Sequence, residues 1–230
     1  MIMNSEQIKQ QLGIKAAEMV QDGTTIGIGT GSTANYFILA LGERVKKGLN
    51  IRGVPTSDSS KLLAEESGIP TLDLNDAETI DIAFDGADEI NDSLDLIKGG
   101  GGAMLQEKMV AFAARHFIVM ADESKMVQQL GKFPLPVEVV PYGWKKVKLY
   151  IEAMGCKQVT LRIRNENVFI TEHEHYILDC HFNTIPDPDT LNQQLHSIPG
   201  VVETGLFLHM AKDVLVGYAD GTTKLIHRAS

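Results

Sequence analysis

The first half of the chain alternates between helical and strand-like hydrophobic patterns. From residue 8 to 20, apolar side chains recur at the three- and four-residue spacing of one helix face. Strands are predicted at 24–28, 51–54, 80–84 and 116–121, and helices at 8–20, from Ser32, up to Glu66, and at 103–115. Strands separated by helices are typical of βαβ units. This half therefore predicts a parallel, doubly wound sheet of the Rossmann-like kind.

A different pattern begins near Leu130. The prolines of Phe133-Pro-Leu-Pro136 fix φ, and we expect a rigid, extended hinge there. Beyond it the pattern predicts, in order, strand 137–140, helix 144–154, strand 159–164, strand 168–182, helix 187–198 and strand 201–207. This β-α-β-β-α-β order is typical of a ferredoxin-like α+β domain.

The C-terminal segments 213–218 and 223–227 flank Asp220-Gly221 and predict a hairpin that could return to the large sheet. With 230 residues, the chain is long enough for two modest domains. We predict an α/β fold with a Rossmann-like catalytic domain over 1–130 and 208–230. A smaller ferredoxin-like domain is expected over 131–207.

Composition narrows the function classes. A net charge of −9 argues against general nucleic-acid affinity, because phosphate-backbone binding needs clustered cations. Cys156 and Cys180 lack CxxC spacing, which favours neither a zinc site nor a disulfide framework. The start lacks a signal-peptide pattern, and no apolar stretch approaches the ~18 residues of a membrane span. We therefore predict a cytoplasmic protein that binds neither nucleic acid nor membrane.

Candidate chemistry follows the predicted strands of the first half. In an open α/β sheet, ligands bind beyond the carboxyl ends of the strands. The segments at those ends are Gly29–Thr33, Thr56–Ser60, Asp85–Glu89 and Asp122–Lys125. A glycine run, Lys98-Gly-Gly-Gly-Gly102, precedes the helix that carries Glu107. We expect all five segments to converge on one crevice.

Two of these segments have competing interpretations. Gly29-Thr-Gly-Ser-Thr33 can wrap a phosphate, since glycines allow close approach and the next helix supplies free N–H groups. The same residues fit a dinucleotide fingerprint, or a plain strand–helix turn. Asp85 and Asp88 could accept hydrogen bonds from sugar hydroxyls and assist ring opening. The alternative is a turn followed by a helix cap.

The glycine run and Glu107 carry the most information. Four successive glycines cost backbone entropy and are hard to justify unless the backbone must approach something closely. The i±3 and i±4 neighbours of Glu107 are apolar, namely Ala103, Met104, Val110 and Ala111. Such surroundings predict a partly desolvated carboxylate, whose pKa would rise toward the range of a general base. The alternative is a solvent-facing Glu107 paired with a lysine.

These parts suit an aldose–ketose isomerisation. A base must move a proton between two carbons through an enediolate, while a cation and amide donors hold the developing oxyanion. Glu107 fits the first role, and Lys98 with the glycine amides fits the second. Lys125 fits phosphate neutralisation, although alone it would be interpreted as a solvated surface lysine.

Segments 27–34, 85–90, 98–101 with Glu107, 130–139 and 198–207 resemble, in order, ribose-5-phosphate isomerase, type A. The resemblance covers essentially the whole chain, except that Gly102 is often alanine in the family. It implies interconversion of D-ribose 5-phosphate and D-ribulose 5-phosphate in the pentose phosphate pathway, with Glu107 as base and no metal or cofactor. It also implies a homodimer or a dimer of dimers. Implied contacts with the sugar phosphate are Thr30, Gly31, Ser32, Thr33, Asp85, Gly86, Ala87, Asp88, Lys98, Gly99, Gly100, Gly101 and Lys125.

Two other classes remain open from the residues, and a third, a related enzyme, is disfavoured. A nicotinamide-dependent oxidoreductase would use the Gly29 loop but would leave Lys98 and Glu107 without a purpose. A non-catalytic sugar-phosphate sensor would need a DNA-binding extension, for which the chain has no basic patch. An aminosugar-phosphate deaminase would need a histidine in the motif loops, and none stands there. His173 and His175 could share a metal, but a polar strand face is the favoured interpretation.

Overall fold

The computed structural model describes residues 2–229, which form two compact units. The first contains the residues up to Ala87, Gln106–Met126 and the residues from His209 on. The second contains Asp88–Leu105 and Val127–Leu208. Residues 88–105 thus group with the second unit, whereas the predicted domain limits of 131–207 leave them out. Those limits stay a prediction.

The first unit is built on a six-stranded sheet in the order β15-β14-β6-β3-β1-β2. Its strands are β1 (Thr25–Ile28), β2 (Arg52–Pro55), β3 (Ile82–Asp85), β6 (Phe117–Asp122), β14 (Asp213–Gly217) and β15 (Thr223–His227). All neighbours are parallel except β14 and β15. The predicted parallel sheet and the returning hairpin are confirmed.

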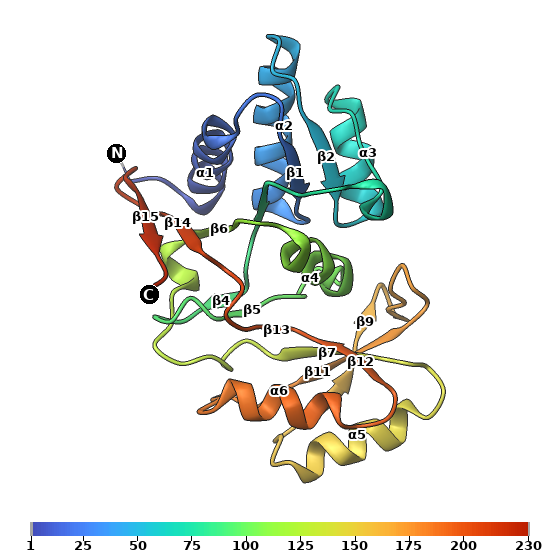
Figure 1. Cartoon of the computed structure of the whole chain (residues 1–230). Helices are drawn as coiled ribbons and strands as arrows, with labels where there is room; N and C mark the ends of the chain where they lie inside the picture. Colours follow the sequence, from blue (N-terminus) through green and yellow to red (C-terminus); the bar gives the residue numbers. More distant parts are fainter. Residues whose placement is uncertain (1, 230) are drawn as a thin grey trace. The chain divides into compact units, whose positions relative to one another are not determined.

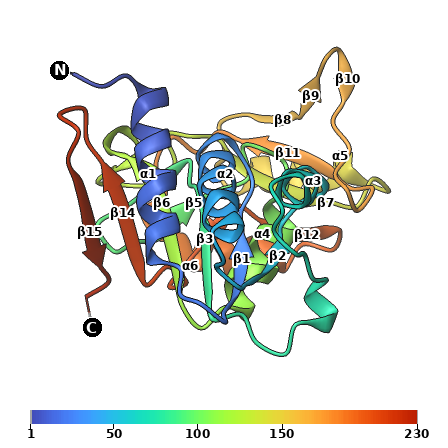
Figure 2. The same cartoon turned by 90° about the horizontal axis from the view of Figure 1, so that it is seen from above.

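Helices pack on both faces of this sheet (Figure 1). They are α1 (Ser5–Met19), α2 (Ser32–Lys46), α3 (Asp58–Glu66) and α4 (Met104–Ala113), with short 3₁₀ turns η1 (Leu74–Asp76) and η2 (Glu123–Lys125). Figure 2 shows α1, α2 and α3 side by side on one face. Along β1, Ile26 and Ile28 join a core with Leu12 of α1 and Phe37 of α2.

Gly27 lies between those two isoleucines and points to the other face of the sheet, since side chains alternate along a strand. A Cβ placed on Gly27 would lie 2.6 Å from Val110 Cγ1 of α4. Glycine therefore lets α4 lie directly on β1. This close approach fixes the helix that carries Glu107, three residues before Val110.

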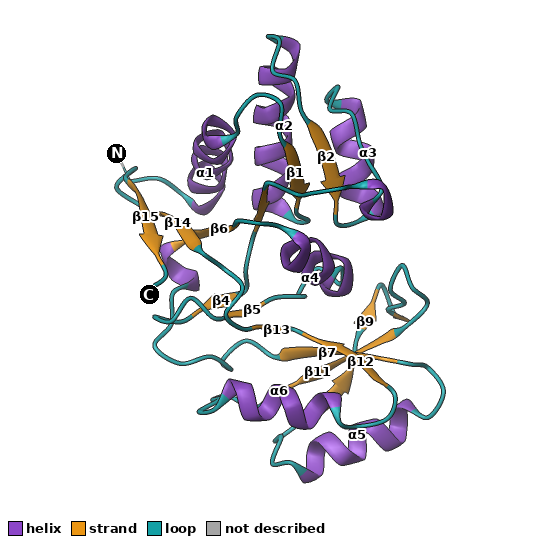
Figure 3. Ribbon diagram, in the orientation of Figure 1, coloured by secondary structure: helices purple, strands orange, loops and turns teal. Residues whose placement is uncertain are grey.

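The second unit has a four-stranded antiparallel sheet in the order β12-β7-β11-β8, with two helices (Figure 3). Its elements are β7 (Leu135–Val139), α5 (Trp144–Ala153), β8 (Val159–Leu161), β11 (Tyr176–Cys180), α6 (Pro188–His196) and β12 (Val201–Thr204). When the strands of this sheet alone are numbered along the chain, their order in space is 4-1-3-2, and helices follow the first and third of them. The predicted ferredoxin-like arrangement is confirmed.

The two faces of this sheet pack against different parts of the unit. Val137 and Leu178 share a core with Ile151 of α5 and Leu195 of α6. Alternate residues of the same strands, among them Pro136, Glu138 and Asp179, point to the opposite face. A Cβ on Gly99 would lie 3.2 Å from Pro136 Cγ, so this second face lies against the glycine run.

Several predicted elements of the second unit are wrong in detail. Strand 168–182 is interrupted: β9 (Ile163–Arg164) and β10 (Asn167–Val168) form a separate hairpin, and β11 starts only at Tyr176. The interruption is a turn over residues 171–175, in which the Glu174 N–H donates to Thr171 O at 2.9 Å and φ of Glu174 is 61°, a value incompatible with a strand. Strand 201–207 divides at Gly205 into β12 and β13 (Leu206–Phe207).

The region around the predicted hinge also differs. Leu135 and Pro136 belong to β7 rather than to a connecting segment. Pro136 has no N–H, but its carbonyl accepts a hydrogen bond of 2.7 Å from the Gly205 amide. A three-stranded antiparallel sheet, β13-β5-β4, adds β4 (Glu89–Ile90) and β5 (Leu96–Ile97), which the sequence pattern did not predict. No helix among residues 2–229 is long and apolar enough to cross a membrane.

Candidate active site

Asp85 ends β3 and is locked against the turn that follows β1. The carboxylate is 3% exposed, and its Oδ1 accepts hydrogen bonds from the Thr30 N–H (3.1 Å) and the Gly86 N–H (2.7 Å). A Cβ on Gly29 would lie closer than 3.0 Å to three atoms of this side chain. Gly29 therefore makes room for Asp85, a task that a phosphate-loop interpretation of the motif does not include.

Hydroxyl groups connect the loops after β1 and β2. Thr30 Oγ1 lies 2.8 Å from both Thr56 Oγ1 and Ser57 Oγ. Gly31 is the N-cap of α2, with φ of 110°, and brings no capping side chain to the first turn. The N–H groups that begin α2 at Ser32 are thus the ordinary donors of an anion-binding helix start. Thr33 is half-buried in this first turn.

Glu107 projects from the first turn of α4 into the first unit. It is 4% exposed and lines a small pocket with Gly29, Thr56 and Asp85. Phe84, Val110 and Ala111 line the same pocket. The expected shielding of Glu107 from solvent is confirmed, and its apolar neighbours along the helix are the reason.

The second unit contains the glycine run and two charged residues beside it, Lys98 and Asp88. Lys98 is 3% exposed; its N–H donates to Gly205 O (2.9 Å), and its Nζ lies 5.4 Å from the centroid of the Phe207 ring. Asp88 Oδ2 accepts a 2.9 Å hydrogen bond from the Gly100 N–H. A carboxylate thereby orients one amide of the run.

Gly99 and Gly102 need to be glycine for conformational reasons. Their φ values are 102° and 95°, which side chains rarely adopt. A Cβ on Gly102 would also lie closer than 3.0 Å to two ring carbons of Phe169. Glycine at position 102 therefore suits both the backbone conformation and the aromatic neighbour.

Lys125 ends the η2 turn that follows β6 and is half-buried. The Asp122 side chain caps this turn by accepting from the Ser124 N–H at 3.0 Å. Gly86 and Ala87 follow Asp85 and are also half-buried.

The structure thus brings the predicted residues together in two groups. Thr30, Asp85, Gly86 and Glu107 share hydrogen bonds or a pocket in the first unit. Asp88 and Gly100 are bonded in the second unit, where Lys98 begins the same run. The chain crosses between the units after Ala87 and again after Leu105. Sequence analysis missed Arg162, which contacts the glycine run, and Asp179, which is bonded to Arg162.

The remaining histidines and cysteines take part in local contacts. His175 Nδ1 lies 3.0 Å from Glu138 Oε1, which also accepts from the Thr171 hydroxyl. A hydrogen bond with Cys156, together with burial, raises the pKa of the Cys180 thiol well above its ordinary value. Among residues 2–229, no three His, Cys, Asp or Glu side chains are grouped so that they could hold a metal ion.

Comparison with known proteins agrees with this architecture. The family model of ribose 5-phosphate isomerase A (phosphoriboisomerase A) matches residues 52–221. Ribose-5-phosphate isomerase A 1 of Oceanobacillus iheyensis is 46% identical over 94% of this chain and 96% of the relative. Ribose-5-phosphate isomerase A of Parvibaculum lavamentivorans is 48% identical over 96% and 98%.

Solved structures give the same result. A D-ribose-5-phosphate isomerase in complex with phospho-erythronic acid superposes with a TM-score of 0.94 at 41% identity, covering 98% of this chain and 100% of that one. Ribose 5-phosphate isomerase A from Methanocaldococcus jannaschii gives 0.92 at 41% identity, with coverages of 97% and 100%.

The chain has a Rossmann-like unit with a shielded carboxylate beyond its strands, followed by a ferredoxin-like unit. Together with the matched structures, this α/β architecture identifies the chain as an isomerase. More particularly, the chain belongs to the ribose 5-phosphate isomerase A family. The resemblance predicted from its motifs is confirmed.

Proposed function

We propose that the chain interconverts D-ribose 5-phosphate and D-ribulose 5-phosphate, with Glu107 as the general base. The observation that carries this proposal is the burial of Glu107 beside Asp85 and Thr56, at the carboxyl ends of β1, β2 and β3. A carboxylate shielded from water is a stronger base than one in bulk solvent, because desolvation disfavours its charged form. Family membership supports the same reaction.

The reaction moves one proton between carbons. Glu107 removes the proton from C2 of the ring-opened aldose, and the electron pair of that C–H bond forms the C1–C2 double bond of an enediolate. Glu107 then returns the proton to C1, while the proton of the C2 hydroxyl passes to the C1 oxygen, so that C2 becomes the ketone and C1 carries a hydroxyl. Negative charge grows on the C1 oxygen during the first step and must be stabilised.

Lys98 and the amides of the glycine run are assigned to that negative charge. A cation and N–H donors that are already oriented stabilise a developing oxyanion without further reorganisation. The fixed backbone of the run supports this role, since Gly100 is held by Asp88 and Lys98 by Gly205. Asp85 and Asp88 are assigned to the sugar hydroxyls and to ring opening.

The phosphate is assigned to the loop from Thr30 to Thr33 and to Lys125. The uncapped start of α2 and the adjacent hydroxyls match the three free oxygens of a phosphate monoester. Gly86, Ala87 and Gly99–Gly101 complete the proposed contacts. A homodimer or dimer of dimers, a cytoplasmic location and the absence of nucleic-acid or membrane partners are part of the same proposal.

One observation weighs against the dinucleotide interpretation of the Gly29 loop. The Thr30 N–H, which a dinucleotide loop would offer to the ligand, donates instead to the carboxylate of Asp85. The same side chain lies against Gly29, where a pyrophosphate would approach. A negative side chain there repels a pyrophosphate held over Gly29, whereas the phosphate monoester of the proposal binds farther along, at the N–H groups that begin α2 at Ser32.

The direct test is formation of ribulose 5-phosphate from ribose 5-phosphate by the purified chain, with and without EDTA. Turnover that is insensitive to chelation is the expected result. An inactive wild-type chain would overturn the proposed reaction, and activity that EDTA abolishes and a divalent metal restores would overturn its metal-free form. Light scattering of the same sample tests the proposed dimer or tetramer.

A further inference from the structure

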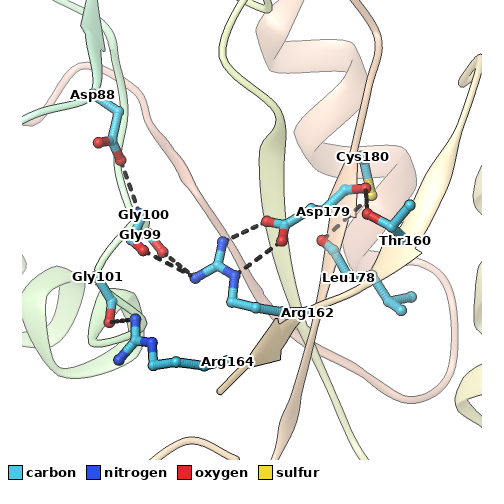
Figure 4. Close-up of polar contacts among 10 residues, drawn as sticks. All are labelled: Asp88, Gly99, Gly100, Gly101, Thr160, Arg162, Arg164, Leu178, Asp179 and Cys180. Carbon is cyan, nitrogen blue, oxygen red and sulfur yellow. Dashed lines mark hydrogen bonds and ion pairs between the residues drawn. The ribbon is translucent and has the colours of Figure 1, made fainter. Parts of the chain in front are cut away.

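Arg162 joins the glycine run to the sheet of the second unit (Figure 4). It directly follows β8, and its side chain is only 10% exposed. Its Nη1 donates to Gly99 O at 2.7 Å and to Gly100 O at 3.4 Å. Its Nε donates to Asp179 Oδ2 at 3.0 Å, and its Nη2 donates to Asp179 Oδ1.

This geometry directs the donors of the guanidinium at protein atoms. One edge is held by the carboxylate of Asp179, and the remaining nitrogen faces two backbone carbonyls. The ion pair neutralises the charge, which lowers the attraction of Arg162 for an anionic substrate. A role in positioning the backbone therefore fits Arg162 better than a role in binding.

The backbone of the run transmits this orientation to its N–H groups. In a trans peptide unit the C=O and the next N–H point in opposite directions. When Arg162 draws the carbonyls of Gly99 and Gly100 toward itself, the N–H groups of Gly100 and Gly101 turn away from it. The Gly100 N–H does point to a separate group, the carboxylate of Asp88, at 2.9 Å.

Glycine has little conformational preference of its own, so four in succession need an external support to keep one conformation. A neighbouring arginine adds to this support. Arg164 Nη2 donates to Gly101 O at 3.1 Å, and its guanidinium lies 4.4 Å from the Phe169 ring centroid. Arg164 is exposed, however, and its contribution is expected to be the smaller one.

We propose that Arg162, held by Asp179, is a positioning residue that orients the backbone of the run, so that Asp88 holds the Gly100 amide and the Gly101 amide is aimed at the oxyanion of the reaction. The inference rests on the proposed function, in which amides of the run stabilise the enediolate. Arg162 itself is not assigned a contact with substrate.

The test compares Arg162→Met with Arg44→Met in the purified chain. Arg44 is a matched control, because it also donates to two backbone carbonyls, Ala17 O and Val20 O, but at the far end of α2 from Gly31. Both variants lose one positive charge and two hydrogen bonds to backbone carbonyls, and Arg162→Met also loses the two to Asp179. Measurements are kcat and KM for ribose 5-phosphate, the melting temperature Tm, and two inhibition constants.

The inhibitors separate the oxyanion end from the phosphate end. Phospho-erythronic acid, which is bound in a related structure, has a carboxylate that can stand in for the enediolate oxygens. Inorganic phosphate probes only the phosphate end. Removing one oxyanion donor typically lowers kcat by about 10²–10³, so turning the Gly101 donor away without removing it is expected to lower kcat by about 10–100-fold.

For Arg162→Met we expect that fall in kcat, a matching loss of affinity for phospho-erythronic acid, and phosphate inhibition within about twofold of wild type. Arg44→Met should keep wild-type kcat even where its Tm falls as far. A kcat within twofold of wild type in folded Arg162→Met would overturn the inference. So would equal weakening of both inhibitors, which a general loosening of the protein would produce.

Two further variants keep the inference testable if Arg162→Met does not fold. Arg162→Lys retains the charge but not the paired donors, and Asp179→Asn retains the shape but not the charge that holds Arg162. Both should lower kcat and phospho-erythronic acid affinity together, by less than Arg162→Met, and wild-type values in both would overturn the inference. If the wild-type chain lacked isomerase activity, the proposed function would fail instead.

Discussion

The carboxylate of Asp85 occupies the space that a side chain on Gly29 would fill. These residues are 56 positions apart, and β1 and β3 are paired neighbours that bring their carboxyl ends together. A Cβ on Gly29 would approach Asp85 Oδ1, Cγ and Cβ closer than 3.0 Å. The first glycine of the loop is therefore a part of the acidic site as much as of the phosphate loop.

Gly29→Ala should accordingly displace Asp85 and lower kcat/KM by about 10²-fold, since a displacement of about 1 Å at a reacting site has costs of that size. The measurement is steady-state isomerisation together with Tm. Gly42→Ala is the control, because its Cβ would meet Ser67 at 2.7 Å inside the α2–α3 packing and disturb stability alone. Wild-type kcat/KM in Gly29→Ala would show that Asp85 has no such requirement.

Glu107→Gln keeps the shape of the side chain and removes its basicity. We expect kcat to fall by about 10²–10⁴ or more, with KM for ribose 5-phosphate changed by little, because proton transfer is lost and binding is not. Glu43→Gln, at a surface ion pair with Lys46, is the control and should match wild type. A Gln variant with near-normal turnover would remove Glu107 from the mechanism.

Substitution of Lys98 and of Lys125 should change different kinetic constants. Lys98→Ala should lower kcat by about 10²–10³, because it removes charge at the developing oxyanion. Lys125→Ala should instead raise KM by about 10-fold with little change in kcat, since a charged hydrogen bond to the phosphate contributes about equally in ground and transition states. Steady-state kinetics of both variants side by side would distinguish the roles, and identical profiles would contradict the assignment.

Sequence patterns predicted those parts of the molecule that depend on local periodicity. The apolar neighbours of Glu107 at helical spacing predicted its burial, and the β-branched runs predicted the parallel strands. The interruption of strand 168–182 was missed because it depends on Glu174, with φ of 61°, and glutamate is no typical turn residue. The strands β4 and β5 are two residues long, too short to show any period.

Long-range pairings could not be predicted in the same way. Arg162 meets Asp179 because of the register between β8 and β11, in which Thr160 pairs with Asp179. That register depends on the turn at Asn165 and on the core packing of both strands. The contact of Asp85 with Gly29 likewise depends on the pairing of β1 with β3. Motifs indicated candidate residues, whereas the pairing of the strands determines which side chains contact them.

Gly102→Ala tests the requirement for glycine beside Phe169. Alanine must adopt φ of 95° and also displace the Phe169 ring. We expect a loss of about 1–3 kcal/mol in the free energy of unfolding, from the strained backbone and the steric contact. The double variant Gly102→Ala, Phe169→Ala should lose less than the sum of the two single changes, because the contact is absent. Strict additivity in urea unfolding would contradict the contact.

The start of α6 gives a prediction about pH. Asp187 is the N-cap and accepts hydrogen bonds from the Thr190 side chain (2.6 Å) and N–H (3.0 Å), which lower the pKa of its carboxyl below the ordinary value. An acid whose pKa is lower in the folded protein stabilises the fold above its unfolded pKa, and this contribution disappears as the pH falls through the folded pKa.

Asp187→Ala should therefore lower Tm at pH 7, and its difference from wild type should shrink as the pH is taken below the ordinary range of an aspartate. Asp187→Asn is the matched control, because asparagine caps helices about as well as aspartate but does not titrate there. Its Tm should stay near wild type at pH 7. A difference between Asp187→Ala and wild type that stayed constant from pH 7 down to strongly acidic pH would show that charge on Asp187 does not contribute to the cap.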